Sequence, residues 1–274
     1  TDTHPIRGVL ENRPFDFPLT LKGLAPMLRI GVICAKPEAA NLERYLQTAN
    51  TLHRPNDSER DYLLDYPGFQ TAFGLPLELP DIGSAGWVTC NEPASTNPKV
   101  SATQVAHNIT AAIETLRSTY APHVTIILTP KRWQAYREYR DEYEHFDVHD
   151  FVKAYAVQRG AATQFLDEET LSDGQPARVW WWLSLALYAK GMRTPWVLDG
   201  LDGDTAYIGL GFSLDAYAKK GSHVVLGCSH IYSSRGEGLQ YRLSKVENPI
   251  IRGRNPFMSR DDARRTGETI RQLF

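Results

Sequence analysis

The chain has 274 residues, and its 42% hydrophobic content is enough for one large domain or two smaller ones, each with its own core. With 30 basic and 32 acidic side chains the net charge is −2, so any nucleic-acid binding must come from a local patch or a partner. Three isolated cysteines without CxxC spacing argue against a disulfide framework or a zinc site, and no apolar run reaches the roughly 18 residues of a membrane helix, so we expect a cytoplasmic protein.

The first part of the chain predicts an α/β domain that follows a short lead-in. Residues 1–27 contain several prolines and predict an extended segment. The β-branched run at 28–34 predicts a strand, and the helix that follows it has a proline in its first turn, which together indicate a strand-to-helix unit. An amphipathic helix is expected over 103–120 and a buried strand over 123–130. The polar segment 131–146 predicts a further helix.

Polar side chains gather in the stretch that follows. His149 and Lys153 are four residues apart, so on a helix they share one face. Gly160 and the short run after it predict a turn into a strand that brings Gln164 back beside that helix. Lys190 ends the next predicted helix. Two ammonium groups, an imidazole and an amide that converge in this way would suit a terminal phosphate.

Each of these residues also has a purely structural interpretation. A histidine and a lysine four apart on a helix usually form part of a solvated face, as His149 and Lys153 could. A side chain such as Gln164 often satisfies a buried backbone group. Lys190, near a helix C-terminus, would interact favourably with the helix dipole.

After residue 194 the pattern changes to consecutive strands. The apolar runs follow one another without helices between them, which predicts an antiparallel meander. A final helix is expected over 259–274, with Ser259 as its N-cap and Asp262 in its first turn. A domain boundary near 194 is the simplest division, and strands followed directly by a terminal helix suggest that the second domain is incomplete.

The chain resembles the Argonaute family, and within it the short prokaryotic Argonautes that carry only MID and PIWI domains. The resemblance is strongest over 149–171 and continues through LALYAKGMRTPWVL, DTAYIGLGFS and SHVVLGCSHIYSSRGEGLQYRL. It implies a Rossmann-like MID domain over 28–194 and the first part of an RNase H-like PIWI domain over 195–274. Residues 1–27 remain a lead-in segment.

The resemblance also implies a guide-binding site. In the family, four residues of the MID domain hold the 5′-phosphate of a guide strand, and His149, Lys153, Gln164 and Lys190 match them here. A magnesium ion often bridges the first and third guide phosphates. Further basic residues could contact nucleic acid, namely Lys131, Arg132, Arg235, Arg242 and Arg252.

The PIWI part is expected to lack nuclease activity. Slicing Argonautes place their first catalytic aspartate at the end of the first PIWI strand, and Gly211 occupies the matching position. Glycine has no carboxylate with which to hold a catalytic magnesium ion. Asp215 is a poor substitute, because the strand fixes which side chain points into the site.

The resemblance therefore implies guide-directed recognition without slicing. A 5′-phosphorylated RNA guide would recognise complementary single-stranded DNA from an invader, in prokaryotic antiviral immunity. An associated protein with an APAZ domain would carry the effector, which is a TIR domain, a sirtuin-like domain or a nuclease.

Two alternatives stay open at this point. An active RNase H-like nuclease would require carboxylates clustered at strand ends, and Gly211 argues against it. A Rossmann-like module could bind a small phosphorylated ligand. The first predicted strand is followed by CAKPEAAN rather than a G-x-G-x-x-G turn, which disfavours a dinucleotide.

Overall fold

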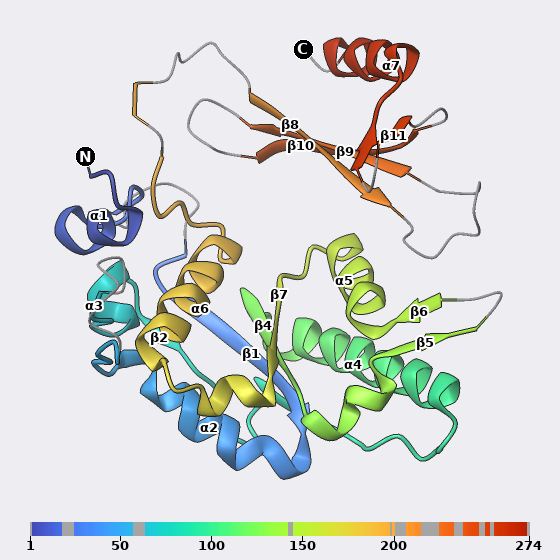
Figure 1. Ribbon diagram of the computed structural model, residues 1–274. Helices are drawn as coiled ribbons and strands as arrows, with labels where there is room; N and C mark the ends of the chain where they lie inside the picture. Colours follow the sequence, from blue (N-terminus) through green and yellow to red (C-terminus); the bar gives the residue numbers. More distant parts are fainter. Residues whose placement is uncertain are drawn as a thin grey trace. The chain divides into compact units, whose positions relative to one another are not determined.

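The chain folds into two compact units, Thr1–Trp196 and Val197–Phe274 (Figure 1). This computed structural model describes residues 2–17, 25–56, 64–141, 145–197, 199–200, 207–214, 225–232, 238–246, 250–252 and 255–272. The domain boundary expected near residue 194 lies close to this division.

A parallel sheet forms the centre of the first unit. Its strands run in the order β2-β1-β4-β7, and β3 also pairs with β1. The strands are β1 (Leu28–Ala35), β2 (Leu77–Glu78), β3 (Trp87–Cys90), β4 (Val124–Thr129) and β7 (Thr163–Asp167). The two central strands are nearly continuous runs of buried residues, as expected of parallel strands covered on both faces.

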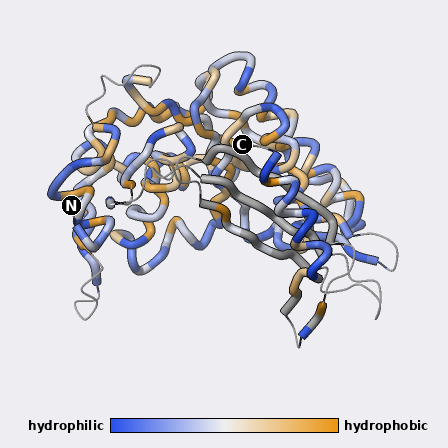
Figure 2. The backbone as a smooth tube through the Cα atoms, turned by 90° about the horizontal axis from the view of Figure 1, so that it is seen from above, coloured by the Kyte–Doolittle hydropathy of each residue, from blue (hydrophilic) through white to orange (hydrophobic). Residues whose placement is uncertain are grey.

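Helices cover both faces of this sheet (Figure 1). On one face α2 (Ala39–Gln47) and α6 (Pro176–Lys190) pack against alternate residues of β1, and on the other face α4 (Pro98–Thr119) and α5 (Val148–Gln158) do so. Figure 2 shows hydrophobic and hydrophilic residues alternating along the chain, consistent with amphipathic helices. The predicted α/β class is confirmed, with helices on both faces of a mostly parallel sheet.

The predicted extended lead-in is wrong over its first part. Helix α1 (Pro5–Asn12) is capped by His4, whose Nδ1 accepts a hydrogen bond from Arg7 N at 3.2 Å. A proline in the first turn of a helix needs no backbone donor, so prolines here do not exclude a helix. The side chains of Ile6 and Val9 are buried in the same core as α2 and α6.

The segment after α1 is fixed to the end of the first unit. Phe15 N donates to Pro195 O at 3.0 Å, and Asp16 Oδ2 accepts from Thr194 N at 2.9 Å. The buried carboxylate of Asp16 also accepts a hydrogen bond from Tyr188. The described part of residues 1–27 is thus integral to this unit.

The polar segment 131–146 is not the helix that the sequence predicts. It begins with the short 3-10 helix η3 (Lys131–Tyr136) and continues as the hairpin of β5 (Glu138–Arg140) and β6 (His145–Asp147). In β5 the two end residues are exposed and Tyr139 packs against the core of α4 and α5. This alternation suits a strand, and it outweighs the helix propensity of the charged residues.

Short elements join the main ones in the first unit. They are η1 (Lys36–Glu38), η2 (Thr48–Asn50), α3 (Phe69–Phe73) and η4 (Glu168–Ser172). The last of these leads from β7 into α6, and it lies over part of α2 through contacts with that helix.

The second unit contains the expected antiparallel meander. Its strands β8 (Tyr207–Leu214), β9 (Val225–Tyr232) and β10 (Gly238–Val246) pair in the order β10-β9-β8, and β11 (Ile250–Arg252) pairs with β12 (Asn255–Phe257). Helix α7 (Arg260–Arg271) follows, and its N-cap Ser259 Oγ accepts from Asp262 N at 3.1 Å, as predicted. None of the helices in the described ranges has the length and apolar character needed to cross a membrane.

Candidate anion-binding site

Three of the four predicted phosphate-binding residues meet at the outer edge of β7. In the ladder between β4 and β7, Thr125 N donates to Ala162 O at 2.9 Å, so the next carbonyl along β7, that of Thr163, points away from β4. Lys153 Nζ donates to this oxygen at 2.6 Å and Lys190 Nζ donates to it at 2.8 Å. The two lysines come from α5 and α6, which cover opposite faces of the sheet.

Gln164 connects this lysine pair, Lys153 and Lys190, to the strand. Its Oε1 accepts from Lys190 Nζ at 2.5 Å, and its Nε2 donates to Phe165 O at 2.9 Å. The amide therefore satisfies a backbone carbonyl, as its structural interpretation suggested, and also orients an ammonium group. Both roles follow from its place on the last strand of the sheet.

The lysine pair carries two positive charges in a half-buried place. Burial lowers the pKa of Lys153, and burial together with the nearby charge of Lys153 lowers the pKa of Lys190 to about 8. Among the described residues, no carboxylate contributes to either pKa as a charge partner. Two like charges beside one carbonyl oxygen are unfavourable alone, so an anion bound between them would be stabilised.

His149 lies beside this group without a hydrogen bond to it. It sits in the first turn of α5, is exposed, and its Nδ1 is 3.1 Å from Asp150 Oδ1. Its ring is 4.8 Å from the ring of Phe165, and Lys153 Nζ lies 5.5 Å from the centre of the same ring. Phe165 thus links the two residues on α5.

Two parts of this site, the Thr163 carbonyl and the Phe165 ring, were not predicted from the sequence. The Thr163 carbonyl carries no side-chain signal, and only the pairing of β4 with β7 gives its direction. Phe165 had a usable signal, because it follows Gln164 on a strand and must point to the opposite face, toward α5.

A pocket of about 390 Å³ opens next to His149 at the carboxyl ends of β4 and β7. Its walls come from β4, β6, α5, β7 and the residue between η3 and β5, with the lining residues Thr129, Arg137, Asp147, Val148, His149, Phe165 and Asp167. Arg137 forms an ion pair with Asp167 across it. The pocket is large enough for a group that stacks on the imidazole.

The basic residues at the start of η3 are held by acidic neighbours. Lys131 is exposed, with its Nζ 3.8 Å from Glu169 Oε1. The guanidinium of Arg132 forms ion pairs with both Glu38 and Glu92. The charge of Arg132 is therefore largely balanced within the protein, which weakens its candidacy as a nucleic-acid contact.

The same ion pairs close the crevice where a Rossmann-like sheet usually binds its ligand. The order of strands reverses between β1 and β4, and Glu38 and Arg132 follow their carboxyl ends. Trp133 Nε1 adds a hydrogen bond to Glu92 Oε2 at 2.6 Å. Two carboxylates in this crevice would repel a phosphate, which counts against the small-ligand alternative at this place.

The other predicted contacts lie in the second unit. Arg252 is exposed, and its guanidinium carbon lies 5.9 Å from the centre of the Phe257 ring. Arg242 belongs to β10, but its side chain is not described. Arg235 and Asp215 lie outside the described residues. Gly211 lies in β8 and pairs with Cys228 of β9.

The described residues offer no suitable magnesium site at the lysine pair. Magnesium prefers oxygen ligands, whereas the side-chain oxygen of Gln164 already accepts from Lys190. Ligand atoms of Asp147, His149 and Asp150 do lie within 4.8 Å of one another at the start of α5. These groups are mostly exposed and already bonded among themselves, so they indicate a helix cap rather than a metal centre.

Comparison with known proteins gives the fold. No family model and no curated protein sequence matches the chain. It is similar in structure to Aa-Ago with externally bound siRNA (TM-score 0.52, 16% identity), over 98% of this chain and 31% of that one. It is also similar to Drosophila Piwi (TM-score 0.52, 14% identity), over 79% of this chain and 24% of that one. The chain spans a third or less of these proteins, and it has the α/β fold of Argonaute proteins.

Proposed function

We propose that the chain binds the 5′-phosphorylated end of a guide RNA at Lys153, Gln164 and Lys190. The observation that carries this proposal is the pair of half-buried ammonium groups on one carbonyl oxygen without a carboxylate partner among the described residues. A terminal phosphate carries a charge of about −1.5 to −2 near neutral pH, which matches the charge of the pair.

His149 has a complementary role in this proposal. Its exposed ring faces the pocket beside β7 and is already 4.8 Å from Phe165. The first base of the guide would stack on it while the phosphate lies at the lysine pair, in the manner of single-stranded RNA recognition by aromatic rings.

Recognition of the target would then be left to base pairing. A guide held at its 5′ end exposes its bases, so complementary single-stranded DNA can pair with it, and the protein need not read sequence. The choice of RNA as guide follows a solved structure of the same fold, described as Aa-Ago with externally bound siRNA.

The chain would act through a partner rather than by cleavage. Gly211 provides no carboxylate for a catalytic metal, so we assign the response to an APAZ-containing effector with a TIR, sirtuin-like or nuclease domain, in prokaryotic immunity. We assign neutralisation of the phosphate charge to Lys153 and Lys190 and not to a magnesium ion, because ammonium groups cannot act as ligands of magnesium.

Binding of labelled RNA with and without a 5′-phosphate, at one salt concentration, tests this function. A charge-assisted hydrogen bond contributes about 1.5–3 kcal/mol, so Lys153→Ala should weaken binding of the phosphorylated RNA by about one to two orders of magnitude. The matched control is Lys36→Ala, which removes an exposed lysine of the same unit and should leave this affinity unchanged. Equal affinity for both RNAs in the wild-type protein would rule out this site.

A further inference from the structure

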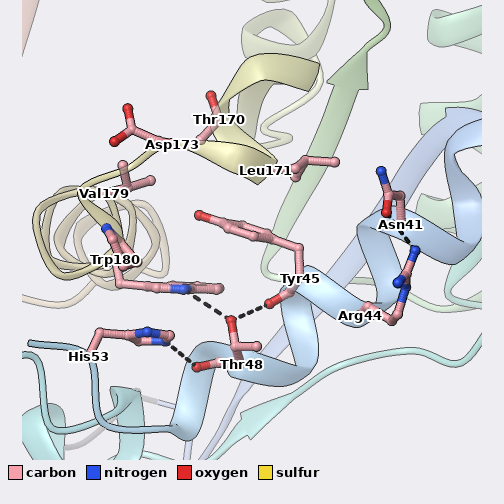
Figure 3. A pocket seen from close by; sticks show the side chains of 11 residues that line it. Asn41, Arg44, Tyr45, Thr48, His53, Thr170, Leu171, Asp173, Val179 and Trp180 are labelled. Atoms are coloured by element: carbon pink, nitrogen blue, oxygen red, sulfur yellow. Dashed lines mark hydrogen bonds between the residues drawn. The ribbon is translucent and has the colours of Figure 1, made fainter.

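A second pocket, of about 420 Å³, lies on the face of the sheet covered by α2 and α6 (Figure 3). Side chains from α2, η2, η4 and α6 line it, and it shares none of them with the lysine pair. Its volume is within the range of about 300–1,000 Å³ that is typical of small-molecule sites.

Stacked aromatic rings form one wall of this pocket. The rings of Tyr45 and Trp180 are 4.7 Å apart and inclined by 14°, and the ring of His53 is 6.3 Å from that of Trp180 at 15°. Trp180 is buried, and its Nε1 donates to Thr48 Oγ1 at 3.2 Å. Figure 3 shows that Thr170 and Leu171 of η4 lie across the Tyr45 ring from Trp180. The stack is therefore held in place, and the face of Tyr45 that is not against Trp180 is turned toward the η4 residues that line the pocket.

Asp173 brings acceptor atoms to the same pocket. Its Oδ1 accepts from Gln175 N at 2.7 Å, and its Oδ2 lies 3.3 Å from Arg178 Nη2. Each carboxylate oxygen can accept more than one hydrogen bond, so both keep capacity for a ligand. Asp173 and Tyr45 line the same pocket, and the charge of Asp173 adds to burial in raising the pKa of Tyr45.

Two further groups mark the pocket as a polar site. The hydroxyl of Tyr45 is buried and has no hydrogen-bond partner in the part of the chain that the structure describes. Such a group is unfavourable unless something else supplies the bond. At the opposite end Arg44 is exposed, with its Nη2 2.7 Å from Asn41 Oδ1.

We propose that this pocket binds a guanine base, stacked on Tyr45 with its donor edge at Asp173. Guanine presents two adjacent donors, N1–H and the 2-amino group, which match the two oxygens of a carboxylate. Adenine presents an acceptor at N1, which would face a negative charge. Arg44 lies where it can compensate a phosphate attached to the sugar. A free guanine nucleotide and a guanine within a strand share this chemistry.

Calorimetric titration of guanosine and adenosine into the full chain tests the proposal. These nucleosides have no phosphate, so neither can occupy the lysine pair. Guanosine should bind, and adenosine should bind about tenfold more weakly or worse, as expected for a lost bidentate contact. Asp173→Asn, which keeps the size of the side chain, should weaken guanosine binding by a similar factor. Tyr45→Phe keeps the stacking ring and removes only the hydroxyl, so it should weaken guanosine binding less than Tyr45→Ala, which removes both.

The controls separate this site from the guide-binding site. Lys153→Ala should leave guanosine binding unchanged, whereas it should weaken binding of 5′-phosphorylated RNA. A further comparison uses two 5′-hydroxyl RNAs, one that contains guanine and one that contains only adenine. Stronger binding of the first would show that the pocket accepts guanine within a strand, and equal binding would restrict the site to the free nucleoside or nucleotide. Absence of guanosine binding at millimolar concentration, equal binding of adenosine, or an Asp173→Asn variant that binds normally would each overturn the proposal.

Discussion

Two lysine side chains, Lys153 and Lys190, determine the chemistry of the proposed phosphate site. Lys153 and Lys190 donate to one backbone oxygen, and the resulting proximity of their charges disfavours protonation of both. A bound dianion would reverse this, because it stabilises the charged form of each amine. Affinity and protonation are therefore linked at this site.

Guide binding should depend on pH in a range where lysines are normally fully charged. The pKa of Lys190 is about 8 in the free protein, below the ordinary lysine value of 10.5. As the pH rises through 8, Lys190 loses its proton and the affinity for 5′-phosphorylated RNA should fall, while that for 5′-hydroxyl RNA changes less. Affinities measured by fluorescence anisotropy between about pH 7 and pH 9 test this expectation.

Lys190→Arg is the matched variant for this dependence. A guanidinium remains charged throughout this range, so the variant should show a flatter pH profile. A wild-type preference for the 5′-phosphate that stays constant up to about pH 9 would contradict the coupling between the two lysines.

Phe165 should position the phosphate-binding groups without touching the phosphate. A cation–π contact contributes about 0.5–2 kcal/mol, so Phe165→Leu should weaken binding of 5′-phosphorylated RNA by a few-fold to about thirtyfold. Phe146→Leu is the control, since Phe146 packs against Phe151 in the same core. Equal loss of phosphate preference in both variants would indicate a general packing effect instead.

At the scale of elements, the sequence predicts the main strands and helices of the first unit and misses the connections. The pattern of α4 is easy to recognise because one face of this long helix is buried. The apolar runs of β1 and β4 are easy to recognise because both faces of the sheet are covered. Strands as short as β2 and β3 have too few residues to show a period. The β5–β6 hairpin is hidden because its charged residues also suit a helix.

The grouping of Lys153, Gln164 and Lys190 could be predicted from the sequence only in part, for similar physical reasons. The spacing of His149 and Lys153 is common on solvated helix faces, and it is the resemblance to Argonautes that connects it with Gln164 and Lys190. Lys153 of α5 and Lys190 of α6 meet around β7 because β7 is the edge strand of the sheet. The order of the strands cannot be predicted from the local sequence pattern of each strand.

The crevice between β1 and β4 should have a structural rather than a binding role. Arg132→Ala would leave the largely buried carboxylate of Glu38 without its partner, which should destabilise the fold by about 1–3 kcal/mol. Thermal unfolding would report this loss, and the affinity for 5′-phosphorylated RNA should stay within a few-fold of the wild type. A large loss of RNA affinity in a folded variant would restore Arg132 as a nucleic-acid contact.

At the scale of the whole molecule, the chain has the α/β fold of Argonaute proteins, and we expect Gly211 of β8 to stand where slicing members have an aspartate. Sequence identities of 14–16% to the solved structures leave the fold recognisable, while each functional residue must be judged by its own surroundings. In the first unit, the lysine pair of Lys153 and Lys190 lies at the outer edge of β7. In the crevice between β1 and β4, by contrast, the charge of Arg132 is balanced by Glu38 and Glu92.

The chain should not cleave DNA that is paired to its guide. Because Gly211 has no carboxylate, incubation with a 5′-phosphorylated guide, complementary single-stranded DNA and either magnesium or manganese should leave the DNA intact on a denaturing gel. Specific cleavage within the paired region, absent without the guide, would show that other residues supply the metal ligands.

The most direct test of the lysine pair is a phosphorus NMR titration of a 5′-phosphorylated guide bound to the full chain. A free terminal phosphate takes up its second proton near pH 6. Bound between Lys153 and Lys190, it should remain dianionic well below that pH, and Lys153→Ala should shift its titration back toward the free value. A bound guide whose phosphate titrates as it does in free solution would contradict the proposed site.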